Sequence, residues 1–389
     1  MTPRGSFAVL FAVTSLLTSR ASAVEIGSEG DLTSLEVHAF ASQGFLLTSS
    51  NNYIDTSSKN GSFQFSEIGI NFTKSLTDKL RFGLQLDAQD FGTTGNYNVK
   101  ADWFYGDYRF TDWFGIRVGR VKIPFGLYNE INDVDSARAF VLLPQSVYPV
   151  QSRDYLLAQT GGEIYGYVRM GGAGALDYRA YGGTIYFSTN QIQIASPFQI
   201  VAVNVPFLVG GRLLWETPLE GLRVGGSVQT LRIDTDILLQ AQPLNLEIPA
   251  TLWIASAEYA HHDLLLAAEY SRWYVKEDSS NARIVPSAPI ETSERAYGLA
   301  TYRVNKWLQP GAYYSVYFPN VDHRDRRADV QHDLAATLRF DINPYWLVKV
   351  EGHYMAGTAG LTSTLNGGLP PSQLERYWGV FLAKTTVYF

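Results

Sequence analysis

Charged side chains of both signs gather in one stretch of this 389-residue chain, between residues 117 and 154. Opposite charges that face one another across water confined by low-dielectric walls create a strong local field, which orients dipolar solutes and separates ions by sign. Any single member of the set could instead be an ordinary solvated side chain. The candidates for such a field, which include one residue from an earlier strand, are Arg81, Arg117, Arg120, Lys122, Glu130, Asp133, Asp135, Arg138, Arg153 and Asp154.

Other kinds of chemistry have little support in the sequence. The six histidines include one adjacent pair, His261-His262, which is followed by Asp263. Three neighbours on a turn seldom converge on one metal ion. No motif fixes a serine or threonine nucleophile beside a histidine and an acid. No phosphate-cradling glycine-rich loop and no basic face for nucleic acid is recognisable. We therefore predict no catalytic residue, no metal site, no cofactor and no nucleic-acid partner.

The elements that must position the charges are strands with two different faces. Between residues 80 and 89, leucine, phenylalanine and alanine at even positions alternate with arginine, glutamine and aspartate at odd positions. Two further alternating runs, 100–110 and 114–122, meet at the short turn Thr111-Asp112. After Pro124 the alternation stops, and residues 123–160 carry no clean strand pattern. Long structureless segments are uncommon in compact domains unless they have a function.

The same alternation recurs in about sixteen segments, each near the ~9 to 11 residues with which a tilted strand crosses a bilayer. Short turns and longer connections follow one another in strict alternation along the chain. This rhythm is typical of outer-membrane barrels, which have short periplasmic turns and long external loops. A half-buried sheet of a soluble sandwich would show similar strands, but it has no reason to place all long loops at one end. The longer connections expected after residue 160 are 188–206, 234–248, 277–292, 318–329 and 357–373.

Composition agrees with a barrel. The chain is 46% hydrophobic and only 17% charged, which argues against disorder. After the N-terminus, no run approaches the ~18 apolar residues of a transmembrane helix. No cysteine is present, so stability must come from closure of the sheet and its hydrogen bonds. We predict an all-β fold, a transmembrane antiparallel β-barrel of about sixteen strands covering residues 24–389.

The N-terminal residues 1–23 are predicted to be a signal peptide. They contain Arg4, an apolar run from Phe7, and the small residues Ala21-Ser22-Ala23 before the expected cleavage site. An uncleaved anchor is the alternative, but the apolar core is short for one. Export would place the protein in the outer membrane of a Gram-negative bacterium.

The residues from Asp107 to about Tyr155 also resemble a known family. The segments DYRFTDWFGIRV and GRVKIPFGLYNE, followed by LLPQSVYP, resemble Gram-negative outer-membrane porins of the phosphate-selective porin O and P superfamily. The resemblance implies a sixteen-stranded barrel, usually a homotrimer, whose third external loop folds into the lumen and narrows it. The unpatterned segment 123–160 is the third long connection, so it is the expected constriction loop. The last strand, which ends in Phe389, resembles the terminal strand that the barrel-assembly machinery recognises in porins.

These observations predict a porin that allows passive diffusion of small hydrophilic solutes and ions. Sixteen strands enclose a lumen too wide for side chains alone to fill. The inward faces carry acidic residues as well as basic ones, so a general porin is the main prediction. A phosphate-selective or anion-selective porin is the alternative. A barrel receptor or adhesin with a plugged lumen is a further alternative. The expected surroundings are the lipid bilayer and lipopolysaccharide.

Overall fold

The computed structural model describes residues 24–26, 35–92, 95–186, 198–239, 242–281 and 286–389. The expected signal peptide, residues 1–23, lies outside this part of the chain. The strands of the first half are β1 (Val24–Ile26), β2 (Leu35–Thr48), β3 (Phe65–Ser75), β4 (Leu80–Phe91), β5 (Lys100–Thr111), β6 (Phe114–Lys122), β7 (Ala158–Arg169) and β8 (Ala175–Thr184). Those of the second half are β9 (Phe198–Glu216), β10 (Leu222–Leu239), β11 (Gln242–His261), β12 (Leu264–Ser279), β13 (Ala288–Tyr302), β14 (Leu308–Phe318), β15 (Gln331–Asn343), β16 (Trp346–Gly357) and β17 (Tyr377–Tyr388).

In the described residues, helical structure is confined to short turns in the connections. The one α-helix in the described residues, α1 (Arg153–Leu156), has four residues. No described helix has the length and apolar character that crossing a membrane would require. The 3-10 turns are η1 (Ser58–Asn60), η2 (Asn129–Ile131), η3 (Asp135–Ala137), η4 (Val150–Ser152), η5 (Gly171–Ala173), η7 (Arg327–Asp329), η8 (Thr364–Asn366) and η9 (Pro371–Gln373).

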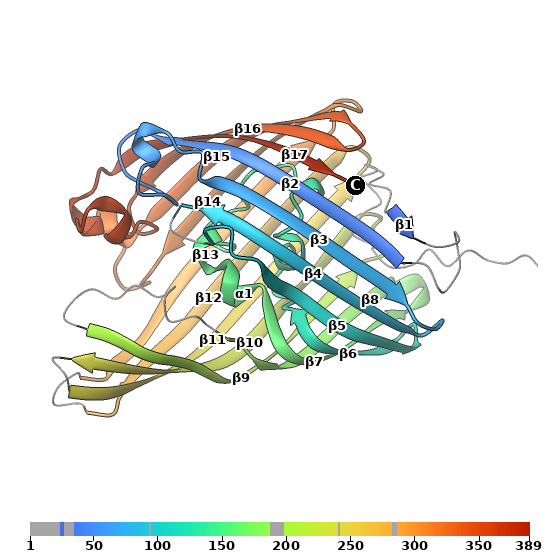
Figure 1. The fold of residues 1–389 in the computed structure, drawn as a ribbon, viewed down its shortest axis with the longest axis horizontal. Coiled ribbons are helices and arrows are strands. Elements are labelled where there is room, and N and C mark those ends of the chain that lie inside the picture. The colour runs from blue at the N-terminus through green and yellow to red at the C-terminus, as the bar shows by residue number, and fades with distance from the viewer. Residues whose placement is uncertain (1–23, 27–34, 93–94, 187–197, 240–241, 282–285) are drawn as a thin grey trace, which may run out of the picture.

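The strands form one closed antiparallel barrel. Each strand from β2 to β17 pairs with its neighbours in sequence, and β17 pairs with β2, for example at Val380↔Thr48, to close the ring. The sheet has seventeen strands in all, of which β1 adds only three residues against β2, so the ring itself has sixteen. Figure 1 shows these tilted strands side by side around the barrel. Closure leaves no sheet edge, which confirms the predicted fold.

The two faces of the wall have the polarity of a membrane barrel. On β4, Gln85 and Asp87 keep only 2% and 1% of their surface exposed, whereas Phe82 on the opposite face keeps 42%. On β6, Val118 is 62% exposed and Arg117 is buried. A soluble sheet buries its apolar face, and here the apolar face is the outer one. This reversal places lipid outside and polar groups inside.

Four strands on one side are much longer than the sequence predicted. β9, β10, β11 and β12 have 19, 18, 20 and 16 residues. The loop expected at 234–248 is wrong, because the β10–β11 ladder continues through Asp236↔Asn245 to Leu239↔Gln242. The loops expected at 188–206 and 277–292 are likewise shortened by the early start of β9, the late end of β12 and the early start of β13. A small apolar cluster that includes Ile237 and Leu244 holds the extension together. The connections expected at 318–329 and 357–373 are confirmed.

Candidate functional site

Most of the charges selected from the sequence lie on the segment between β6 and β7, residues 123–157, which we call the cross-barrel segment. Pro124 has no backbone N–H and cannot continue the ladder of β6. The neck of the segment is closed by a hydrogen bond from Ile123 N to Leu157 O (2.8 Å). The side chain of Asn129 ties the same neck, because its Nδ2 donates to Ile123 O and to Leu156 O, both at 2.8 Å. The segment is therefore a compact loop with its ends together.

Its first set of contacts is with β4, β5 and β6. Asp133 accepts from Lys122 Nζ (2.6 Å) and from Gln85 Nε2 (2.9 Å). Arg153 donates to Asp87 (3.4 Å) and to Asp102 (3.2 Å). Burial alone would raise the pKa of Asp133, but the charges of Lys122 and Arg153 outweigh it and lower that pKa. The segment is thus fixed to this part of the wall by charge-assisted bonds.

A second set joins it to β8 and β9. Glu130 pairs with Arg212 (2.8 Å) and Arg179 (3.6 Å). Partial burial favours the neutral acid, but Arg179, Arg212 and Arg117 lower the pKa of Glu130 to about 2. Arg179 and Arg212 lie directly opposite each other in the β8–β9 ladder, and two like charges in that position repel. Glu130 offsets this repulsion.

A third set reaches the strands at the end of the chain, β16 and β17. Asp135 accepts from Lys349 Nζ (3.0 Å), from Lys384 Nζ (3.3 Å) and from the hydroxyl of Thr386 (2.7 Å). Asp135, Lys349 and Lys384 each keep 1% or less of their side-chain surface exposed. Burial would raise the pKa of Asp135, but the two lysines and Arg138 lower it well below its ordinary value.

Backbone groups of the segment bond to two wall carboxylates. Glu351 on β16 accepts from the N–H groups of Val141 (2.7 Å) and Leu142 (3.0 Å). Glu269 on β12 accepts from Leu127 N (2.9 Å) and from the hydroxyl of Tyr148. These N–H groups belong to no ladder, so the carboxylates supply acceptors for buried donors. Leu127 N also donates to the hydroxyl oxygen of Tyr148 (3.0 Å).

Apolar contacts complete the attachment. The segment contributes Phe125, Phe140 and Val147, among others, to a cluster that also holds inward residues of β8 to β15, such as Leu208 and Ile254. One side of the inner wall is therefore apolar where the segment packs against it. Taken with the ion pairs, the contacts of the segment extend around the ring from β4 to β17.

The structure places the candidate residues in three different situations. Glu130, Asp133, Asp135, Lys122 and Arg153 join segment to wall as described. Arg138 pairs with Asp135 at 3.5 Å within the segment. Opposed charges were expected to face each other across water, and in these pairs they are in direct contact.

The remaining candidates belong mainly to the wall. Arg117 pairs with Asp107 (3.4 Å) and Glu163 (3.1 Å), and Arg81 pairs with the same Asp107 (3.2 Å). Arg120 donates to the backbone carbonyl of Asp102 (2.7 Å). The side chain of Asp154 lies outside the described part of the structure.

Several residues of the site were not among the candidates. Arg179, Arg212, Arg339, Lys349 and Lys384 carry charge to the segment or to its partners from strands outside the stretch that suggested the site. The strand pattern could have identified these five basic residues as inward-facing, because each of them shares one face of its strand with other polar residues.

Comparison with known proteins agrees with this geometry. The family model described as phosphate-selective porin O and P matches residues 47–135. No curated protein sequence matches the chain. Among solved structures, OmpF of Salmonella typhi in complex with daunomycin is similar with a TM-score of 0.60 and 14% identity, over 94% of this chain and 100% of that one.

Two further solved structures share the fold. The trimer form of OmpT, an outer-membrane protein of Vibrio cholerae, is similar with a TM-score of 0.55 and 11% identity, over 91% of this chain and 99% of that one. An anion-selective porin from Comamonas acidovorans has a TM-score of 0.54 and 11% identity, with the same shares covered. The fold is therefore that of the outer-membrane porins.

Proposed function

We propose that this protein is an outer-membrane porin of a Gram-negative bacterium, through which small hydrophilic solutes and ions diffuse passively. The observation that carries the proposal is the closed sixteen-strand ring whose polar face is inward and whose apolar face is outward. Such a ring is too wide for the wall side chains to fill. Both the match of residues 47–135 to the porin family and the fold favour a channel over an enzyme.

The cross-barrel segment forms the constriction in this proposal. Its ion pairs with β4 to β6, with β8 and β9, and with β16 and β17 support a position inside the ring. Permeating solutes would pass beside the segment, and the polar groups that its pairs leave exposed would set the preference for charge. Glu130 and Asp177 are the clearest of these, since each keeps about a quarter of its side chain exposed.

A general porin fits the charges better than a phosphate-selective one. Arg117, Arg179 and Arg212 each form at least two ion pairs with carboxylates, so their charges are already offset. A strongly anion-selective filter needs cations whose charge is directed at the solute. Phosphate or anion selectivity is the alternative form of the proposal.

A second candidate function is a barrel receptor or adhesin whose lumen is plugged. The observation in its favour is how fully the segment is bonded around the ring, with Lys349, Arg339 and Glu351 almost completely buried beneath it. In that case the external connections, rather than the lumen, would carry the function.

The proposal extends to processing and assembly. Residues 1–23 would be removed as a signal peptide, and the barrel would be exported to a membrane that contains lipopolysaccharide. The barrel-assembly machinery would recognise β17 and the terminal Phe389. A homotrimer is proposed by analogy with the fold, and the trimer form of the Vibrio cholerae protein supports it.

Conductance in a planar bilayer tests the proposal directly. The refolded protein should produce stable current steps in KCl, in groups of three if the trimer is correct. The reversal potential in a KCl gradient then gives the preferred sign of ion. A barrel that folds, as judged by heat-dependent mobility in SDS, but passes no current would replace the porin with the plugged receptor.

A further inference from the structure

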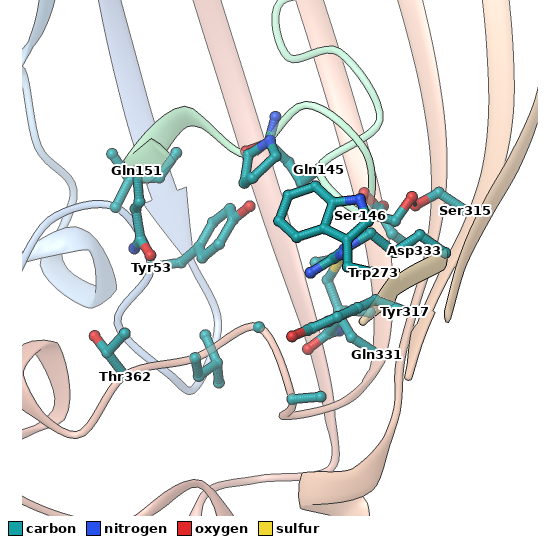
Figure 2. A pocket seen from close by; sticks show the side chains of 17 residues that line it. Tyr53, Gln145, Ser146, Gln151, Trp273, Ser315, Tyr317, Gln331, Asp333 and Thr362 are labelled. Carbon is teal, nitrogen blue, oxygen red and sulfur yellow. Dashed lines mark hydrogen bonds between the residues drawn. The ribbon is translucent and has the colours of Figure 1, made fainter. Parts of the chain in front are cut away.

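A cavity of about 320 Å³ lies at the end of the barrel that carries the longer connections. Its walls come from four parts of the chain: Tyr53 and Ile54 between β2 and β3, residues 145–151 of the cross-barrel segment, residues 359–362 between β16 and β17, and the adjoining ends of β12 to β16. Figure 2 shows Tyr53 and Gln151 on one side of it and Trp273 and Tyr317 on the other. The volume is within the range of pockets that hold small molecules.

Aromatic rings form much of the lining. Trp273 and Tyr317 project from β12 and β14, and both contact the guanidinium of Arg295 on β13. The guanidinium carbon lies 3.4 Å from the centre of the Trp273 ring and 4.8 Å from that of Tyr317. Cation–π contacts of this kind hold rings in place. The two aromatic side chains are therefore fixed before any solute arrives, and each remains partly exposed at the cavity.

The polar groups that can serve a solute are neutral. The hydroxyl of Tyr53 has no hydrogen-bond partner among the described residues, and in Figure 2 it points toward the centre of the cavity. Gln151 and Thr362 add an amide and a hydroxyl to the lining. Gln331 also lines the cavity, but its Oε1 is buried from solvent and its Nε2 donates to His332 O (3.2 Å).

Charged side chains of both signs line the cavity. Arg295 supplies one positive charge, and Asp333 supplies one negative charge that is also bonded to Tyr313 and His353. An anion would approach Arg295 only at the cost of repulsion from Asp333. A neutral solute meets no such penalty, and it can use the amides and hydroxyls as donors and acceptors.

We infer that this cavity is an entry site for a neutral saccharide of one or two rings. The C–H faces of a sugar ring carry small positive charge and pack on the electron-rich faces of aromatic rings, while its hydroxyls bond to amides and phenols. The inference deepens the proposed function, on which it rests for the path of the solute, by naming the class of solute that is held before it reaches the constriction. Binding itself does not require an open pore.

Isothermal titration of the detergent-solubilised protein with maltose tests the site, and conductance of the same preparation is recorded separately. Trp273→Leu should weaken maltose binding by about tenfold, because it removes a stacking surface. Tyr53→Phe removes only the hydroxyl and should weaken binding about threefold, as expected for one hydrogen bond. Inorganic phosphate should not displace the sugar.

Two matched substitutions serve as controls outside the cavity. Trp253 lies on β11 and Tyr97 lies between β4 and β5, and neither residue lines the cavity. Trp253→Leu and Tyr97→Phe should therefore bind maltose as the unchanged protein does. The conservative Tyr53→Phe change keeps the test decisive if Trp273→Leu fails to fold.

The outcomes separate the two proposals. Maltose binding without current would overturn the porin and leave the site in place. Current without maltose binding at tens of millimolar would overturn the site and leave the porin in place. Displacement of maltose by phosphate, or equal losses in the control variants, would also refute a neutral saccharide site in this cavity.

Discussion

Replacing Asp135 by asparagine should release the cross-barrel segment from the wall. The substitution keeps the size of the side chain but removes the carboxylate charge that pairs with Lys349 and Lys384. Lys384 keeps Glu67 as a second carboxylate partner. Both lysines are almost fully buried. Removing one partner of a buried ion pair costs roughly 3–5 kcal/mol of stability, because it leaves the other charge buried without compensation. Lys349 keeps the backbone carbonyls of residue 135 and Phe140 as acceptors, so the lower end of that range applies.

A loss of 3 kcal/mol corresponds to a rise of about 150-fold in the undocked fraction of the segment. Trypsin can report this fraction, because the segment contains Arg138 and Arg153, both of which are buried when it is docked. When opening and closing are fast compared with cleavage, the cleavage rate follows the open population. Mass spectrometry should therefore detect cuts after these two arginines roughly two orders of magnitude faster than in the unchanged protein.

Asp112→Asn is the matched control. Asp112 lies on the turn between β5 and β6 and keeps 68% of its side chain exposed, and its one ion pair with a described residue is with Arg109. It should leave the cleavage rate unchanged, since exposed pairs contribute little. If Asp135→Asn folds and is cleaved no faster than this control, the buried pairs do not hold the segment. Faster cleavage without a change in conductance would mean that the segment is held by these pairs but does not constrict the pore.

Three further outcomes follow from the same contacts. Glu130→Gln removes one of the carboxylates that offset Arg179 and Arg212, so the reversal potential in a KCl gradient should move toward anion preference; an unchanged potential would place Glu130 off the ion path. Because the pKa of Glu130 is lowered from 4.5 to about 2, the stability that its ionised form contributes is complete above the ordinary carboxyl range and is lost progressively as pH falls from about 4.5 to 2. Cleavage of the segment by pepsin should accordingly rise more steeply across this range in the unchanged protein than in Glu130→Gln, and parallel curves would contradict this assignment. Val118→Arg, on the lipid face of β6, should lower the free energy of unfolding by about 2–4 kcal/mol in urea titrations in lipid vesicles, whereas no loss would mean that this face does not contact lipid.

The fold could be predicted from the sequence because each strand carries its own information. Alternation in β4 identifies which side chains face inward, and it requires nothing from the rest of the chain. Strand lengths were harder to predict. We expected each strand to have about ten residues, the number needed to cross the bilayer. With that length, the predicted end of β10 came too early. The apolar alternation in fact continues through Ile237, and again in β11 through Leu244 and Leu246.

The contacts of the site could be predicted only in part. The acidic residues of the segment and several basic residues of the wall could be identified by type and spacing. The ion pairs that they form could not be predicted. Asp135 and Lys349 are separated by 214 residues, and their contact depends on the ring closing in one register. A single sequence does not contain that register, which is why Lys349 and Lys384 were missed while the nearby Lys122 was found.

The separation of these partners also determines an order of events during assembly. Asp135 bonds to Lys349 and Thr386, which follow it by 214 and 251 residues. Contacts over such distances cannot form until the late strands have been made and placed beside the early ones. β17 must pair with β2 before the group around Asp135 is complete.

Until then, Val141 and Leu142 of the segment lack part of their apolar cover, because their cluster includes residues of β17 such as Trp378. Exposed apolar surface in a late intermediate promotes aggregation. A truncation that removes β17 would therefore leave this part of the segment exposed.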